Sequence, residues 1–386
     1  MAIMQGFPPT YENRATLANW RTAPYCSWAF HHVREIVPSA NIANDPENVW
    51  ELVQGTLDLT SADLETAVSG MQNDALVILH RGRIVHESYR NGMGRHDPHI
   101  LMSVSKSMLG LLAGTLVESG ELNPAALLTD YIPELAGTAY VGATVRDALD
   151  MRVGVRFEED YFATEGPIIE YRRAANWNPV PEGYWLHDLR SFQSLMTESD
   201  GPHSDRFHYV SPVTDLMAWV LERASGMRYA DLMSERLWKP MGAEDTSYIT
   251  VDRIGGARAA GGMCVTARDL ARVGQLILQK GARNGRQIIS ESWIDDITHN
   301  GDRNAWDRGD FALNYGETDT AYRSKWYVLG QKEPLIHGRG IHGQYLFIDP
   351  VRDLVIAWMS SENDPTSDIW KGHVMAAVAR IRAAVK

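Results

Sequence analysis

Residues 101–110, LMSVSKSMLG, place three serines and one lysine at the head of a long apolar run. The apolar residues that follow recur at helical spacing, so we predict a mostly buried helix over residues 103–119. On that helix Ser103 and Lys106 share a face, whereas Ser105 and Lys106 diverge. The stretch is typical of a catalytic serine with its lysine, and equally of a serine-rich helix cap with a solvated lysine.

The start of a helix would favour the chemistry of a nucleophilic serine. A serine hydroxyl is a poor nucleophile near neutral pH and needs a base to take its proton. The unpaired N–H groups and the positive end of the helix dipole favour negative charge near Ser103 and oppose the ammonium form of Lys106. Burial in a cleft would also lower the pKa of Lys106. A neutral Lys106 amine could then accept the serine proton, alone or through a second group.

Two later segments carry groups that could complete such a site. In RFHYVSPVTD, residues 206–215, Tyr209 and Ser211 alternate along an extended segment and would point the same way. Tyr209 could shuttle a proton from Ser103 to a leaving group, or it could pack at the start of a helix with Ser211 as the N-cap. In GRGIHGQYLFIDP, residues 338–350, three glycines precede an edge-like strand. A backbone N–H there could help to form an oxyanion hole, and a tight turn is the alternative.

Apolar patterns predict sheet near both ends of the chain and helices between them. Alternating apolar runs around turn residues predict β-hairpins at 74–89 and 344–360. We expect one further helix at 213–225 and another at 366–384. A third helix should follow Thr266, which resembles a capping box together with Asp269.

This order of elements predicts an α+β fold with an antiparallel sheet flanked by helices. We expect residues 1–95 and 245–386 to form one discontinuous sheet-containing domain. A mainly helical domain at 96–244, which carries the serine, the lysine and the tyrosine, would interrupt it. Loops rich in Pro, Gly and Tyr at 161–190 and 300–325 are expected to cover the cleft between the two domains.

The charge balance and cysteine content exclude several function classes. The formal net charge of −12, without a basic cluster, argues against partners such as nucleic acid or a membrane surface. The longest uncharged apolar stretch, 108–117, is too short to span a bilayer, and residues 1–15 do not resemble a secretion signal, so we expect a cytoplasmic protein. With only Cys26 and Cys264, a disulfide framework or a cysteine-rich metal site is excluded. We expect no metal and no cofactor.

The three segments, in this order, resemble the serine β-lactamase and penicillin-recognising fold. Within that fold the chain most resembles the class C β-lactamase-like group of family VIII carboxylesterases and 6-aminohexanoate-dimer hydrolases. The likeness covers most of the chain, including LMSVSKS, YIPELAG, EEDY, CTARDLARVG and GIHGQ. It implies a β-lactamase-like sheet with an inserted helical domain and an active site at their interface.

The resemblance also implies roles for individual residues. Ser103 would be the acylated nucleophile, with Lys106 and Tyr209 as the proton-transfer pair. Backbone N–H groups of Ser103 and Ile341 would form the oxyanion hole. Tyr161, in EEDY, matches a tyrosine that contacts the substrate amide. The other candidate substrate-binding residues are Arg172, Trp177, Ser211, His342 and Gly343.

Departures from the family pattern bear on the substrate. β-Lactamases of this fold usually carry Tyr-x-Asn and a Lys-Thr-Gly-like strand, whereas this chain has Tyr209-x-Ser211 and Ile341-His342-Gly343, which weakens any affinity for a penicillin carboxylate. The 6-aminohexanoate-dimer hydrolases, which act on nylon oligomers, hold their charged linear substrate with acidic or amide residues. At the matching positions this chain has Arg172, Ala260 and Thr366. Arg172 in place of an aspartate should repel an ammonium group.

The sequence therefore favours a serine hydrolase that cleaves a small ester or linear amide through an acyl-enzyme. β-Lactam hydrolysis or D-amino peptide cleavage is the alternative within the same chemistry. A non-catalytic sensor that becomes acylated without turnover is the alternative of another class. The expected partners are a small-molecule ester or amide substrate and a possible second copy of the chain in a homodimer.

Overall fold

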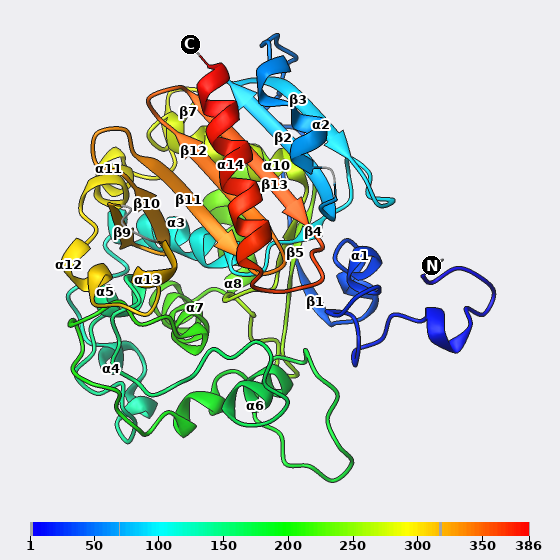
Figure 1. Cartoon of the computed structure of the whole chain (residues 1–386). Helices are drawn as coiled ribbons and strands as arrows, with labels where there is room; N and C mark the ends of the chain where they lie inside the picture. The colour runs from blue at the N-terminus through cyan, green and yellow to red at the C-terminus, as the bar shows by residue number, and fades with distance from the viewer. Residues whose placement is uncertain (1–2, 69, 316–318, 386) are drawn as a thin grey trace.

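A seven-stranded antiparallel sheet, in the order β3-β2-β13-β12-β11-β10-β9, forms the centre of the molecule (Figure 1). The structure, a computed structural model, describes residues 3–68, 70–315 and 319–385. Strands from the two ends of the chain meet in this sheet, because β2 pairs with β13 from Asn73↔Ser360 to His80↔Leu354. The strands are β2 Asn73–His80, β3 Arg83–Tyr89, β9 Thr320–Arg323, β10 Trp326–Leu329, β11 Leu335–Gly340, β12 Gln344–Asp349 and β13 Leu354–Ser360.

Both predicted hairpins are present, as β2–β3 and β12–β13. Asp349 closes the second turn by accepting hydrogen bonds from the N–H groups of Val351 and Arg352, at 3.1 and 3.2 Å. The expectation that the strand after the glycines is edge-like was wrong. That strand, β12, pairs with β11 on one side and β13 on the other, because residues 335–340 form a strand of their own.

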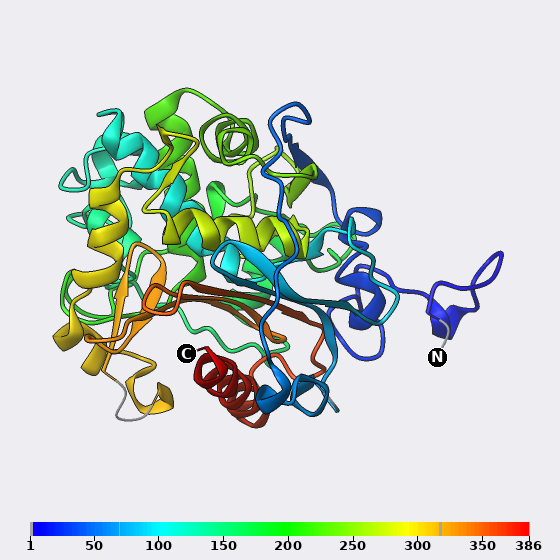
Figure 2. The ribbon, with the colours of Figure 1, turned by 90° about the horizontal axis from the view of Figure 1, so that it is seen from above.

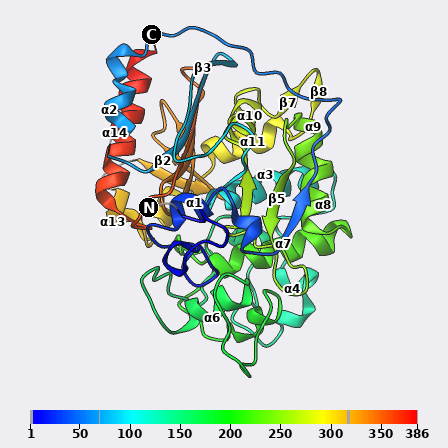
Figure 3. The ribbon, with the colours of Figure 1, turned by 90° about the vertical axis from the view of Figure 1, so that its right-hand side faces the viewer.

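Helices cover the two faces of this sheet (Figures 2 and 3). Side chains alternate along β2, so that Leu76 and Ile78 pack with α14 while Val77 and Leu79 pack toward α10. Gly274 lets α10 approach closely, because a Cβ there would lie 2.4 Å from Val355 Cγ1. The helices around the sheet are α2 Leu64–Val68, α10 Ala267–Leu278, α11 Glu291–His299, α12 Arg303–Asp307, α13 Ala312–Tyr315 and α14 Asp368–Ala384.

Helix α3, Val104–Glu118, lies between the sheet and the helical part of the molecule, and its bounds match the predicted helix closely. It contacts β11 on one side and α7 on the other. Helix α7, Ser211–Ser225, begins two residues before the predicted start, because Pro212 is tolerated in the first turn. Its N-cap is Val210, so Ser211 is not the N-cap. The remaining helices are α1 Cys26–Ala29, α4 Leu128–Tyr131, α5 Val145–Leu149, α6 Pro167–Ala174, α8 Tyr229–Met233 and α9 Lys239–Met241.

The two segments predicted as loops contain helices. Helix α6 lies within 161–190, since Pro167 suits a first helical turn and Ile168, Ile169 and Tyr171 become buried. The segment 300–325 contains α12, α13 and β9, and its residues 316–318 lie outside the described residues.

A second sheet, of order β1-β5-β6-β4, joins the N-terminal region to the middle of the chain. The described elements of residues 96–244 are helical except for β4, and the exact domain boundaries stay a prediction. Among the described residues, none of the helices is both long and apolar enough to cross a membrane. The remaining strands are β1 Ser39–Ile42, β4 His99–Ile100, β5 Ser247–Thr250, β6 Met263–Val265, β7 Ala282–Arg283 and β8 Arg286–Gln287.

Candidate active site

The N-terminus of α3 brings Ser103 and Lys106 into contact. Lys106 Nζ lies 2.9 Å from Ser103 Oγ and also donates a hydrogen bond to the Ala260 carbonyl at 2.6 Å. The Ser103 side chain makes no capping hydrogen bond to the helix, and only 1% of Lys106 is exposed. The alternative of a serine cap with a solvated lysine is therefore contradicted by this geometry.

The surroundings of Lys106 favour its neutral amine. Burial, with a smaller effect of the positive charge of Arg258, lowers the pKa of Lys106 to about 7 against the opposing charges of Glu159 and Asp215. A substantial fraction of Lys106 is thus uncharged at neutral pH, with a lone pair next to the Ser103 hydroxyl.

Tyr209 precedes α7 and lies against the same lysine. Its ring centroid is 5.0 Å from Lys106 Nζ, and only 5% of the residue is exposed. Asp310 fixes the backbone by accepting a hydrogen bond from the Tyr209 N–H at 2.8 Å, and the ring packs on Phe311 at a centroid distance of 5.0 Å. The structure therefore gathers the three predicted catalytic residues, Ser103, Lys106 and Tyr209, around one point.

Three cavities adjoin this point. The main cavity, about 310 Å³, is lined by Ser103 and Tyr209 as well as by Thr366. The narrow cavity, about 30 Å³, is also lined by Ser103 but not by Tyr209. The side cavity, about 570 Å³, does not include Ser103. Tyr161 and Ile341 line all three cavities, so the side cavity adjoins the two cavities that Ser103 lines.

The predicted substrate-binding residues fall around these cavities. Arg172, Trp177, Ser211 and Ala260 line the narrow cavity, and His342 lines the side cavity. His342 also has a packing role, because its Nδ1 lies 2.6 Å from the Glu362 carbonyl. Gly343 lines none of the three; it belongs to a smaller neighbouring cavity beside the main one.

Gly340 brings the backbone around Ile341 close to the nucleophile. A Cβ at position 340 would lie 2.9 Å from the Ser103 N and 2.7 Å from the Leu101 carbonyl oxygen. Only glycine allows such an approach without a shift of the backbone. The end of β11 therefore lies against the residue whose N–H is the other predicted oxyanion donor.

Comparison with known proteins places this arrangement in a family. A family model described as beta-lactamase matches residues 61–379. The chain belongs to the beta-lactamase family. It is 35% identical over 369 residues to a 6-aminohexanoate-dimer hydrolase from Paenarthrobacter ureafaciens, covering 95% of this chain and 93% of that protein.

Two solved structures have a fold similar to that of this chain. A Bacillus anthracis protein named after the 6-aminohexanoate-dimer hydrolases superposes with a TM-score of 0.86 at 26% identity, over 97% of this chain and 98% of that chain. A family VIII carboxylesterase has a TM-score of 0.60 at 13% identity, over 86% of this chain and 99% of that chain, a likeness of fold alone.

Sequence reasoning missed two carboxylates of this beta-lactamase-family site. Glu159 lines the main and narrow cavities, accepts a hydrogen bond from the Ser211 N–H and is hydrogen-bonded to the Tyr161 phenol. Burial, followed by the charge of Glu159, raises the pKa of Tyr161. The position of Glu159 within EEDY was the available signal.

Asp215 is the second missed carboxylate. It accepts a hydrogen bond from the Ala260 N–H at 2.8 Å and forms a buried ion pair with Arg258. Since the Ala260 carbonyl holds Lys106, Asp215 positions the lysine through Ala260. The signal was a charged residue among the apolar positions of the predicted helix at 213–225.

Proposed function

We propose that this member of the beta-lactamase family is a serine hydrolase that cleaves small esters or linear amides through an acyl-enzyme on Ser103. The observation that carries the proposal is the buried Lys106 amine, 2.9 Å from Ser103 Oγ, with its pKa lowered to about 7. The identity to the Paenarthrobacter ureafaciens hydrolase supports hydrolysis as the reaction class. We further propose that the enzyme is cytoplasmic, needs no cofactor, acts on a small molecule and can form a homodimer.

Acylation follows from the geometry of the three side chains. Ser103 Oγ attacks the carbonyl carbon of the substrate as its proton passes to the neutral Lys106 amine. The carbonyl oxygen takes up the negative charge and accepts hydrogen bonds from the backbone N–H groups of Ser103 and Ile341. When the tetrahedral intermediate collapses, the bond to the leaving group breaks. Tyr209 relays the proton from Lys106 to the departing oxygen or nitrogen.

Deacylation reverses the roles with water as the nucleophile. The neutral Lys106–Tyr209 pair accepts a proton from water, and the resulting hydroxide attacks the acyl carbon. Collapse breaks the bond to Ser103 Oγ, which recovers its proton from the pair, and the carboxylic acid leaves. One ester or amide and one water thus give one acid and one alcohol or amine.

Covalent labelling tests the assignment of the nucleophile. A fluorophosphonate probe should add its mass to the wild-type chain and not to Ser103→Ala. Ser105→Ala is the matched control on the same helix, because Ser105 Oγ accepts a hydrogen bond from the Met263 N–H, away from Lys106, and this variant should still be labelled. Equal labelling of wild type and Ser103→Ala would reject the assignment.

Steady-state hydrolysis separates the proposal from its alternatives. We expect continuous turnover of p-nitrophenyl butyrate, with Ser103→Ala reduced by at least about 10³-fold. A burst without steady-state turnover would instead indicate an acylated sensor. Turnover of a chromogenic cephalosporin at a comparable kcat/KM would indicate a β-lactamase.

A further inference from the structure

The side cavity has an unusual charge for this acidic protein. The chain carries a formal net charge of −12, yet three arginines and no Asp or Glu line the side cavity. Two of these arginines, Arg21 and Arg172, also line the narrow cavity, which Ser103 shares. Glu159 lines the narrow cavity as well, so the region without a carboxylate is the side cavity, which adjoins the narrow cavity at the two arginines.

Arg21 and Arg172 have no acidic partner among the described residues, whereas the third arginine, Arg173, pairs with Glu170 at 2.6 Å. Arg21 Nη2 donates to the side chain of Asn178, and its buried Nε has no hydrogen-bond partner. Arg172 is 8% exposed, and its Nη2 donates to the Tyr161 carbonyl at 3.1 Å. Neither guanidinium meets a counter-charge in these contacts.

The guanidinium groups of Arg21, Arg172 and Arg258 lie close enough for the charge of one to lower the pKa of another. Burial, together with the charges of Arg172 and Arg258, lowers the pKa of Arg21 to about 9. Burial and the charge of Arg258 lower the pKa of Arg172 in the same way. Asp215 forms an ion pair with Arg258, whereas Arg21 and Arg172 form none among the described residues, and the more distant charges of Glu159 and Asp160 only partly oppose the lowering of the Arg172 pKa. Buried cations are costly unless an anion joins them.

We propose that Arg21 and Arg172 bind a carboxylate on the acyl part of the substrate, so that the enzyme prefers monoesters or monoamides of dicarboxylic acids. The inference rests on the proposed function. Tyr209 lines the main cavity and not the narrow one, so the leaving group that it protonates lies in the main cavity. The acyl part then extends through the narrow cavity toward the two guanidinium groups.

The chemistry of the ligand follows from the two donors. A guanidinium group presents paired N–H groups that match the two oxygens of a carboxylate, and the fit is strongest where water is excluded. An ammonium group at the same place would be repelled. Hydrolysis of such a monoester by water yields the free dicarboxylate and an alcohol.

Three p-nitrophenyl esters of matched acyl length test the preference: the monoester of adipic acid, the hexanoate and the 5-(trimethylammonio)pentanoate. For the wild type we expect kcat/KM to be at least about tenfold higher for the anionic ester than for the neutral one, and lowest for the cationic one. In Arg21→Gln and Arg172→Gln the anionic-to-neutral ratio should fall toward one, mainly through KM. Arg172→Asp should reverse the preference toward the cationic ester.

Arg156→Gln is the matched control, because Arg156 pairs with Glu198 where both side chains are exposed. It should keep the wild-type ratio. A wild-type ratio near one, or an unchanged ratio in both Arg21→Gln and Arg172→Gln, would overturn the carboxylate site while leaving the hydrolase proposal intact.

Direct binding decides the inference independently of turnover. Isothermal titration calorimetry of Ser103→Ala with adipate should show binding. The affinity should be lower by about tenfold or more in the double variant that carries both Ser103→Ala and Arg172→Gln. Absence of binding, or equal binding by the two proteins, would overturn the carboxylate site. If the wild-type protein were neither labelled by the probe nor able to hydrolyse any of the esters, but adipate still bound, the proposed function would be rejected and the carboxylate site would stand.

Discussion

Burial changes the chemistry of one lysine in this protein. Lys106 is almost completely enclosed, and its pKa falls from 10.5 to about 7 chiefly because the charged form loses its hydration. Between about pH 7 and 10.5, Lys106 therefore carries a proton in the unfolded chain but not in the folded chain. The contribution of Lys106 to the free energy of unfolding decreases as the pH falls from about 10.5 to about 7. Burial of Lys106 thus lowers the free energy of unfolding at neutral pH but provides a neutral amine that can act as a base.

The pH dependence of kcat/KM should report this pKa. Only the neutral amine accepts a proton, so kcat/KM for a neutral ester should rise with pH, with a midpoint at about 7. Burial raises the pKa of Glu362 to about 7 as well, and Glu362 lines none of the three cavities around the serine. In Glu362→Gln, kcat/KM should therefore still rise with pH with the same midpoint. If the rise were lost in this variant, the titrating group would be Glu362.

At the scale of elements, the end of β11 and the start of α3 form the reacting centre together. Gly338 and Gly340 let the strand approach the helix, since a Cβ at 338 would lie 2.9 Å from Ser107 Oγ. The helix supplies the serine and the lysine on one face, and the strand supplies the backbone at Ile341. Neither element would form the site alone.

Gly340→Ala should disturb this contact. The added Cβ would overlap the Ser103 N and the Leu101 carbonyl, and a displacement of the nucleophile by about 1 Å should lower kcat/KM on the order of 10²-fold. Gly372→Ala is the control, because Gly372 lies in α14 with open space around it and should stabilise the protein by about 0.5–1 kcal/mol. Kinetics and thermal unfolding of both variants provide the measurement. Unchanged kinetics in Gly340→Ala would contradict the close approach.

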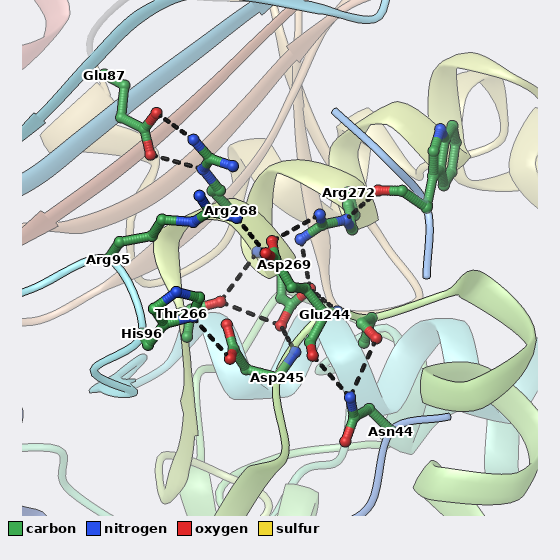
Figure 4. Close-up of polar contacts among 12 residues, drawn as sticks. Asn44, Glu87, Arg95, His96, Glu244, Asp245, Thr266, Arg268, Asp269 and Arg272 are labelled. Atoms are coloured by element: carbon green, nitrogen blue, oxygen red, sulfur yellow. Dashed lines mark hydrogen bonds and ion pairs between the residues drawn. The ribbon is translucent and has the colours of Figure 1, made fainter. Parts of the chain in front are cut away.

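At the scale of the whole molecule, a buried ion cluster joins the sheet-covering helix α10 to the end of the helical part (Figure 4). Asp269 accepts hydrogen bonds from the N–H groups of Glu244 and Asp245, at 2.8 and 3.0 Å, and pairs with Arg272 at 2.8 Å. Arg268 forms two hydrogen bonds to Glu87 on β3, at 2.7 and 2.6 Å. Side chains from three parts of the chain thus meet at the start of α10.

Removing the central carboxylate should weaken the whole fold. Asp269→Ala leaves Arg272 and two backbone N–H groups without their shared acceptor, which should lower the free energy of unfolding by about 3–5 kcal/mol. Lys280→Ala, which breaks the exposed pair with Glu291, should leave the unfolding midpoint nearly unchanged. Denaturant unfolding of both variants measures the difference. Equal midpoints would show that the cluster does not join the two parts.

The amino-acid sequence by itself determined the local elements. The apolar spacing after Ser103 predicted α3, and the alternating runs predicted both hairpins, because these patterns depend on side chains only a few positions apart. The serine and the lysine on one turn of helix followed from the same local geometry. The helix within 161–190 was missed because the Pro, Gly and Tyr residues on either side of it favoured a loop.

The tertiary structure alone decided the electrostatics of the site. Lys106 contacts Ala260, and Asp215 holds Ala260 in place, across separations of 154 and 45 residues. Arg21, from the N-terminal region, lines the same cavity as Ser103 and Arg172. The sequence shows which charges exist, but the energy of a charge depends on which groups surround it and whether water reaches it. Those conditions arise only when distant segments pack together.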